Sequence, residues 1–66
     1  MNNSTQEPDR FLREAEVAHI TGLSRTTRWR LERRGEFPRR RSISCNAVAW
    51  LASEIRAWMT ERAEVA

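Results

Sequence analysis

The stretch Thr-Gly-Leu-Ser at residues 21–24 decides the fold, because it has the composition of a tight corner between two helices. Gly22 can take a positive φ in such a corner, and the apolar side chain of Leu23 should then point inward. Ser24 is a typical N-cap, since its hydroxyl can accept a hydrogen bond from a backbone N–H two or three residues later. The sequence therefore predicts that one helix ends at this corner and that a second begins directly after it.

The helix before the corner is expected over residues 14–21. Val17 and Ile20 are three residues apart, which places them on one face of a helix. Phe11 and Leu12, just before this helix, are candidate core contacts.

The helix after the corner is expected over residues 25–34, and Gly35 is expected to end it. At about 100° per residue, Thr27 and Leu31 share one face. The opposite face holds a mostly basic set: Arg25, Thr26, Trp29, Arg30 and Arg33. A helix with so little apolar surface must be held in place by its neighbours.

The chain after the second helix predicts a hairpin. Phe37-Pro38 is expected to be a loop, because proline disfavours helix there. Two short strands are expected at about residues 40–44 and 47–50, around a turn at Cys45-Asn46, with period-two apolar positions at Ile43, Val48 and Trp50.

A third helix is expected over residues 52–63, and its one-sided stripe should face the core. The stripe consists of Leu51, Ile55, Trp58 and Arg62, flanked by Met59. Trp50 and Trp58 are expected in the core, because a small domain depends on such large burials. Residues 1–9 are expected to form a disordered tail and residues 64–66 to fray, which leaves a domain over residues 10–63.

The positive charge is concentrated in the middle of the chain. All 12 basic residues are arginine, and 8 of them lie in residues 25–41, against only Glu32 and Glu36. The planar guanidinium group suits phosphate and guanine, and a localised basic patch is typical of proteins that bind polyanions. The alternative is an arginine-rich surface that is simply solvated.

Several classes of protein are not expected. A chain of 66 residues makes one small domain, with no room for a ligand pocket beside a nucleic-acid module. One cysteine and one histidine cannot supply an internal disulfide or a zinc site, and two glycines supply no phosphate-binding loop. An enzyme, a cofactor and a metal are therefore not expected. No apolar run reaches the roughly 18 residues of a membrane span, and the polar N-terminus lacks a signal core, so we expect a cytoplasmic protein at the nucleoid.

The basic helix and the basic hairpin together predict contacts with double-stranded DNA. A steep helical corner allows its second helix to enter the major groove, where Arg25 and Thr26 would approach base edges. Arg30 and Arg33 would hold phosphates. Trp29 would pack either on the sugar–phosphate backbone or under the hairpin. The triplet Arg39, Arg40 and Arg41 opens the hairpin, which would be either a wing on the adjacent backbone or a solvated strand.

A set of short motifs extends over about residues 10–62: Arg10-Phe11-Leu12-Arg13, Glu16-Val17, Thr21-Gly22-Leu23-Ser24-Arg25, Thr27, Arg30-Leu31, Arg34-Gly35-Glu36-Phe37-Pro38, Ala47-Val48-Ala49-Trp50, Ser53-Glu54-Ile55 and Ala57-Trp58. At these spacings, they give the chain a resemblance to the AlpA family, small phage and prophage regulators related to excisionases and MerR-like proteins. This resemblance implies a mainly α winged helix-turn-helix domain, three helices plus a two-stranded wing. It also implies that the helix over 24–34 binds DNA, with Ser24, Arg25 and Thr26 at its start and Arg30 further along.

The chain departs from that family at two places. Arg28 and Glu32 stand where the family commonly has aliphatic residues. Four residues apart, they could pair along the helix while the stem of Arg28 covers apolar surface, and Arg28 is counted among the candidate DNA contacts. Ser44-Cys45-Asn46 stands where the family often has glycine, so the tip of the wing is expected to differ in shape.

The sequence thus predicts a sequence-specific transcriptional regulator of phage or prophage type, with the wing over 39–50 on the DNA backbone. The alternatives are an excisionase-like architectural factor and an antitoxin-like protein-interaction module. RNA polymerase or an integrase would be a second partner. No coiled-coil stripe is present, so we expect a monomer in solution that assembles on repeated DNA half-sites.

Overall fold

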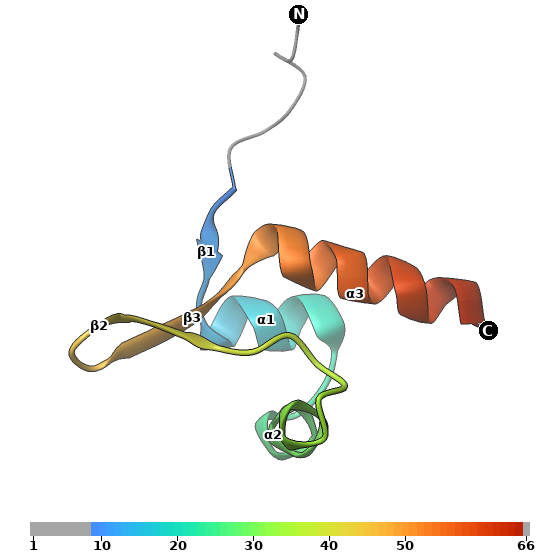
Figure 1. The fold of residues 1–66 in the computed structure, drawn as a ribbon, viewed down its shortest axis with the longest axis horizontal. Helices are drawn as coiled ribbons and strands as arrows, with labels where there is room; N and C mark the ends of the chain where they lie inside the picture. Colours follow the sequence, from blue (N-terminus) through green and yellow to red (C-terminus); the bar gives the residue numbers. More distant parts are fainter. Residues whose placement is uncertain (1–8, 66) are drawn as a thin grey trace, which may run out of the picture.

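The computed structural model describes residues 9–65, which form three helices and a three-stranded antiparallel sheet (Figure 1). The elements, in chain order, are β1 (Phe11–Leu12), α1 (Glu14–Thr21), α2 (Arg25–Arg33), β2 (Arg41–Ser44), β3 (Ala47–Leu51) and α3 (Ala52–Val65). This confirms the predicted fold class, mainly helical with a wing-like hairpin. Most of the predicted tail, residues 1–8, lies outside the described residues, as does Ala66.

The corner between α1 and α2 has the predicted chemistry. Gly22 takes a φ of 73°, and its N–H donates to the carbonyl of Ala18 at 2.9 Å. The hydroxyl of Ser24 accepts from the backbone N–H of Thr27 at 3.2 Å, which satisfies one free donor of the first turn. Figure 1 shows α2 end-on while α1 lies across the view, so the two helices cross steeply.

The end of α2 is set by Gly35, as predicted. Gly35 takes a φ of 76°, and its N–H donates to the carbonyl of Glu32 at 3.0 Å. The N–H of Glu36 donates to the carbonyl of Leu31 at 2.8 Å. This pair of bonds is the Schellman arrangement, which occupies carbonyls that the helix itself leaves free.

Strand β1 was not predicted from the sequence. The strand order is β1-β3-β2, and Leu12 pairs with Trp50 of β3. Next to this strand, both carboxylate oxygens of Asp9 accept hydrogen bonds from Ser53, from its backbone N–H at 3.0 Å and its hydroxyl at 2.6 Å. These bonds cap the first turn of α3, so Asp9 belongs with the folded domain and not with a disordered tail.

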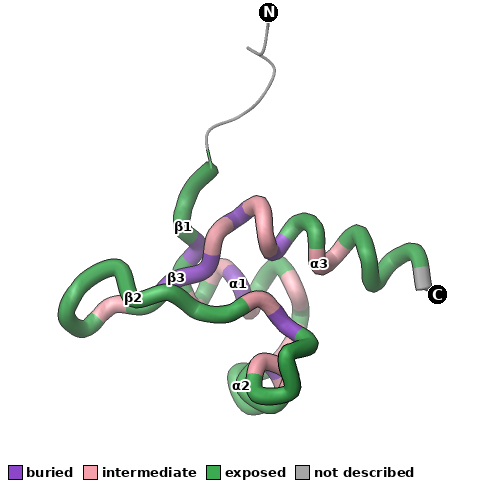
Figure 2. Tube along the Cα trace, viewed as in Figure 1, coloured by how far each residue is buried: buried purple, intermediate pink, exposed green. Residues whose placement is uncertain are grey.

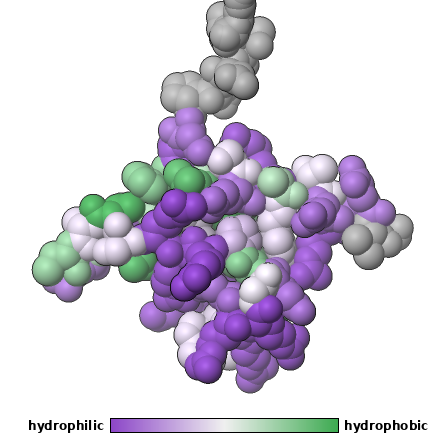
Figure 3. Space-filling view, viewed as in Figure 1, coloured by the Kyte–Doolittle hydropathy of each residue, from purple (hydrophilic) through white to green (hydrophobic). Residues whose placement is uncertain are grey.

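The hairpin forms where the sequence predicted it, with a register irregularity between Ser42 and Ser44. Its apolar side chains Ile43 and Val48 remain 37% and 38% exposed. They stay exposed because the hairpin projects away from the helices, as the left of Figure 1 shows. The same projection carries hydrophobic surface in Figure 3, whereas the surface around α2 is strongly hydrophilic.

The core lies where the sheet meets α1 and the start of α3 (Figure 2). Its buried members are Leu12, Val17, Phe37, Trp50, Ala52 and Ile55, with Leu23, Leu31, Trp58 and Met59 partly buried against them. The predicted inward position of Leu23 is thus confirmed. Phe11 and Ile20 are not core residues, with 47% and 40% of their surface exposed. Three residues turn a helix by about 300°, so Ile20 lies about 60° away from the direction of the buried Val17.

Helix α3 extends to Val65, two residues past its predicted end. Ile55 is buried, and Trp58 packs edge-on against Phe37 with ring centroids 4.8 Å apart. Trp58 is only partly buried, and its indole N–H donates to the carbonyl of Glu36 at 2.7 Å. The loop residue Phe37 therefore joins the core, which its place beside a proline did not indicate. Over the described part of the chain, none of the helices is both long and apolar enough to cross a membrane.

Candidate nucleic-acid interface

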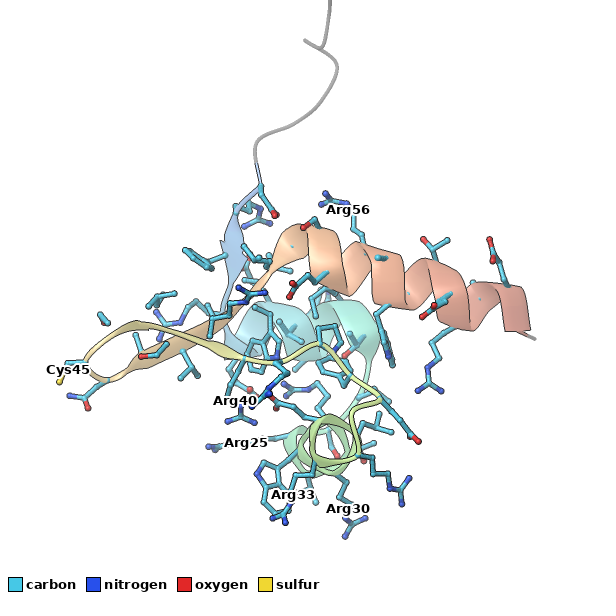
Figure 4. All side chains as sticks on the ribbon, viewed as in Figure 1. Arg25, Arg30, Arg33, Arg40, Cys45 and Arg56 are labelled. Carbon is cyan, nitrogen blue, oxygen red and sulfur yellow. The ribbon has the colours of Figure 1, made fainter. Side chains whose placement is uncertain are left out.

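The outward face of α2 is basic and exposed. Arg25, Arg30 and Arg33 point away from the body of the protein in Figure 4. Within residues 9–65, none of these three guanidinium groups forms an ion pair. Thr26 is exposed on the first turn of the same helix. The predicted face is therefore present on the surface, with its charge unneutralised.

Trp29 lies on this face and is 47% exposed, so it is not buried under the wing. The guanidinium carbon of Arg33 lies 4.8 Å from the centre of its ring, a cation–π distance. A shallow groove runs between α2 and the segment that leads into β2, and it is lined by Trp29, Glu32, Arg33, Gly35, Arg39 and Arg40. The indole thus forms one wall of a basic groove.

Arg28 does not belong to the exposed face. It is 2% exposed, and its guanidinium group donates to both carboxylate oxygens of Glu14 and to the carbonyl of Leu23. Its predicted pairing with Glu32 is wrong. A long side chain at this position points across the corner toward α1, and burial in this place leaves it no surface to offer to DNA. Hydrogen bonding from Arg28 lowers the pKa of Glu14 below its ordinary value.

Glu32 pairs instead with Arg40, just before β2. Its carboxylate accepts from the backbone N–H of Arg40 at 2.7 Å, from Nε at 3.0 Å and from Nη2 at 2.9 Å. Partial burial acts to raise the pKa of Glu32, but the hydrogen bonds from Arg40 outweigh it, and the net shift is downward. The carboxylate is therefore held ionised against the wing.

The three arginines at the base of the wing, Arg39, Arg40 and Arg41, differ in their ion-pair partners. Arg39 is exposed and has no ion pair within the described residues. Arg40 is held by Glu32, and Arg41 donates to Glu54 of α3 at 2.6 Å. Within residues 9–65, Arg39 is therefore the one member of the triplet that forms no ion pair.

With this geometry in view, the chain can be compared with known proteins. Residues 10–63 match the family described as prophage CP4-57 regulatory protein (AlpA). The chain belongs to the AlpA family. It is also 55% identical over 58 residues to an uncharacterized protein, ORF88, of Enterobacteria phage P4. That alignment covers 88% of this chain and 64% of the phage protein, so the chain spans less than two thirds of its relative.

The AlpA match covers the corner, α2 and the wing, and it confirms the resemblance drawn from the sequence.

Beneath α2, two guanidinium carbons, those of Arg28 and Arg40, each lie 5.7 Å from the centre of the Trp50 ring. Glu14 and Glu32 neutralise these two arginines. We call Glu14, Arg28, Glu32, Arg40 and Trp50 the ionic layer. Sequence spacing did not reveal it, because each of its four charged members pairs with a residue outside its own element.

Within residues 9–65, no group of three or more histidine, cysteine, aspartate or glutamate side chains is placed to hold a metal ion. Cys45 is exposed at the tip of the wing, away from α2 (Figure 4).

Proposed function

We propose that this protein is a sequence-specific transcriptional regulator that binds double-stranded DNA. The observation that carries the proposal is the outward face of α2, where Arg25, Arg30 and Arg33 are exposed and unpaired within the described residues. The single acidic residue of the helix, Glu32, is turned inward and bound by Arg40. An approaching polyanion therefore meets positive charge alone on this helix.

In the proposed complex, α2 lies in the major groove. A helix of 9 residues is about 13 Å long at about 1.5 Å per residue, which is enough to reach several base pairs. Arg25 and Thr26 occupy the first turn and read base edges, arginine by pairing with guanine O6 and N7. Ser24 caps the helix at this point, and its hydroxyl is already engaged with Thr27. Arg30, Arg33 and Arg39 hold phosphates on either side of the groove, and Trp29 packs against the backbone between them.

The wing formed by β2 and β3 lies on the flanking backbone. Arg39 leads into it, and Arg40 and Arg41 supply weaker contacts, because Glu32 and Glu54 already neutralise much of their charge. A domain of this kind acts through where it binds, by recruiting or blocking RNA polymerase. We expect the protein to be cytoplasmic and to bind DNA in the nucleoid.

Salt dependence and base preference test this proposal together. Affinity for a duplex selected from a random pool should fall with a log–log slope of about −0.9 per neutralised phosphate. Arg25→Ala should cost roughly 1–3 kcal/mol and relax preference at one base pair, whereas Arg39→Ala should weaken all sequences alike. Arg56→Ala is the matched control, since Arg56 is exposed on α3, far from α2 (Figure 4). A slope near zero, or equal losses for Arg25→Ala and Arg56→Ala, would refute the proposed interface.

A footprint across neighbouring genomic DNA separates this function from its rivals. Protection of a promoter supports a transcriptional regulator, and protection of an attachment site supports an excisionase-like factor that assists an integrase. Absence of any protected site, together with capture of an acidic protein, supports an interaction module. One helix and one wing read only a short site, so we also propose that monomers assemble on repeated half-sites spaced by about 10 base pairs. Insertion of about five base pairs between half-sites should then weaken binding.

A further inference from the structure

Among the described residues, the hydrogen bonds between α2 and the segment that leads into the wing run through one acidic side chain, Glu32. The Glu32 side chain is 13% exposed, whereas the side chain of Glu36, four residues later, is 51% exposed. Glu32 receives three hydrogen bonds of 3.0 Å or less from Arg40, one of them from the backbone N–H. The backbone bond holds the main chain immediately before β2, and the side-chain bonds hold the Arg40 guanidinium group against Trp50. We call this arrangement the Glu32–Arg40 clamp.

The clamp determines where the nearest free charge of the wing lies. Arg39 directly precedes Arg40, and it lines the same groove as Trp29 and Arg33 of α2. If the Arg40 backbone were released, Arg39 would be placed relative to the helix only through its chain neighbours, the buried Phe37 and the strand residue Arg41. Contacts from the wing and from α2 to one duplex require the distance between Arg39 and the helix to be constant, because both must reach their phosphates together.

A carboxylate beside a surface that binds phosphate should, by charge alone, weaken binding. Removal of Glu32 would then strengthen binding to DNA. If the clamp positions the wing, removal of Glu32 would instead weaken binding to DNA, because the wing would have to be ordered each time the complex forms. Replacement of Glu32 should therefore strengthen binding to DNA if its charge dominates and weaken binding if the clamp dominates, so one substitution distinguishes the two effects.

We propose that Glu32 is a positioning residue that, through Arg40, fixes the wing and Arg39 relative to α2 for binding of double-stranded DNA. This inference rests on the proposed function of the α2 face. Glu32 touches no DNA in this arrangement, and Arg40 acts mainly within the protein.

The experiment combines amide hydrogen exchange in the free protein with binding to a fluorescent duplex selected by the parent protein. Glu32→Gln should speed exchange of the Arg40 amide and weaken binding about tenfold, which corresponds to the loss of one charge-assisted interaction. Arg40→Lys keeps the charge but loses the planar fork, so it should also weaken binding. Glu36→Gln removes the same charge from an exposed side chain, and it should leave exchange unchanged and bind as tightly as the parent or slightly more tightly. Thermal melts followed by circular dichroism establish that each variant is folded.

The outcomes distinguish this inference from the proposed function. If Glu32→Gln leaves exchange of the Arg40 amide unchanged, the clamp does not order the wing and the inference is overturned. Faster exchange combined with binding as tight as that of Glu36→Gln would also overturn it, because charge alone would then govern binding. If the parent binds no duplex, the proposed function fails and the positioning role for DNA fails with it, while the exchange data still decide whether the clamp orders the wing. Should Glu32→Gln unfold, Arg40→Lys supplies the same comparison.

Discussion

Helices α2 and α3 are attached to the same small core in different ways. α3 is held by apolar contact: Ile55 is buried, and Trp58 and Met59 pack beside it. α2 contributes only the partly buried Leu31 to that core, and its one fully buried residue is Arg28. Two ion pairs, one toward α1 and one toward the wing, take the place of an apolar stripe.

Because α2 is attached through ion pairs, its inner and outer faces differ in character. Ion pairs on the inner side use directional hydrogen bonds, which fix the rotation of the helix about its axis as well as its distance from the core. The outer side is then free to be mostly basic, since Arg25, Arg30 and Arg33 form no ion pair within residues 9–65. In this protein, therefore, the apolar stripe identifies the helix that forms the core, and α2, which lacks such a stripe, presents an exposed basic face.

The largest expected effect comes from the apolar helix. Ile55→Ala removes buried carbon from a side chain that is 1% exposed, and it should lower the free energy of unfolding by about 2–5 kcal/mol. A domain of this size has about 3–5 kcal/mol in total, so the variant should be largely unfolded at room temperature by circular dichroism. Ile20→Ala makes the same change on α1 at a side chain that is 40% exposed, and it should cost much less. Equal melts for the two variants would show that α3 is not anchored through Ile55.

A smaller effect is expected when the charges under α2 are changed. Glu14→Gln leaves the buried Arg28 without its carboxylate and should cost about 1–3 kcal/mol, near the lower end because the Glu14 side chain is 46% exposed. Arg28→Met removes the buried charge and leaves Glu14, which is 46% exposed and can be solvated by water, so it should cost less than Glu14→Gln. Denaturant unfolding measures both.

Glu16→Gln is the control for this pair of substitutions. It lies on the same helix, but its partner Arg10 is exposed, and surface pairs contribute about 0–1 kcal/mol. If Arg28→Met were the most destabilised of the three, the packing of α2 would depend on the guanidinium group in a way that charge burial does not explain.

Local patterns predicted much of this fold. The corner could be located because Gly22 and Ser24 act on backbone groups within a few residues, and such signals survive without tertiary information. The basic face of α2 could be located for the same reason, since helical periodicity alone places Arg25, Arg30 and Arg33 on one side.

Non-local contacts account for what the sequence did not predict. Strand β1 has two residues, too few for an alternating pattern, and it exists because Leu12 meets Trp50. Arg28 was expected to pair within its own helix, but its partner Glu14 lies 14 residues earlier. The choice among several nearby acids depends on how α1 and α2 cross, and periodicity carries no information about that crossing.

The smallest expected effect is on the pH dependence of stability, and it tests whether α2 is held by charge. The pKa values of Glu14 and Glu32 are lowered in the folded protein, Glu14 chiefly by hydrogen bonds from Arg28, and Glu32 by those from Arg40 against the opposing effect of partial burial. A carboxyl group whose pKa is lower when folded stabilises the protein fully above its ordinary value, 4.5 for glutamate, and loses that contribution as pH falls through the folded pKa. The melting temperature should therefore be nearly constant from neutral pH down to about one unit above that value and then decline. The double variant Glu14→Gln, Glu32→Gln should melt lower at neutral pH but decline less steeply in acid. An identical decline in the parent and the double variant would mean that other carboxylates, such as Asp9 with its pKa lowered by Ser53, control acid stability, and that the ionic layer does not hold α2.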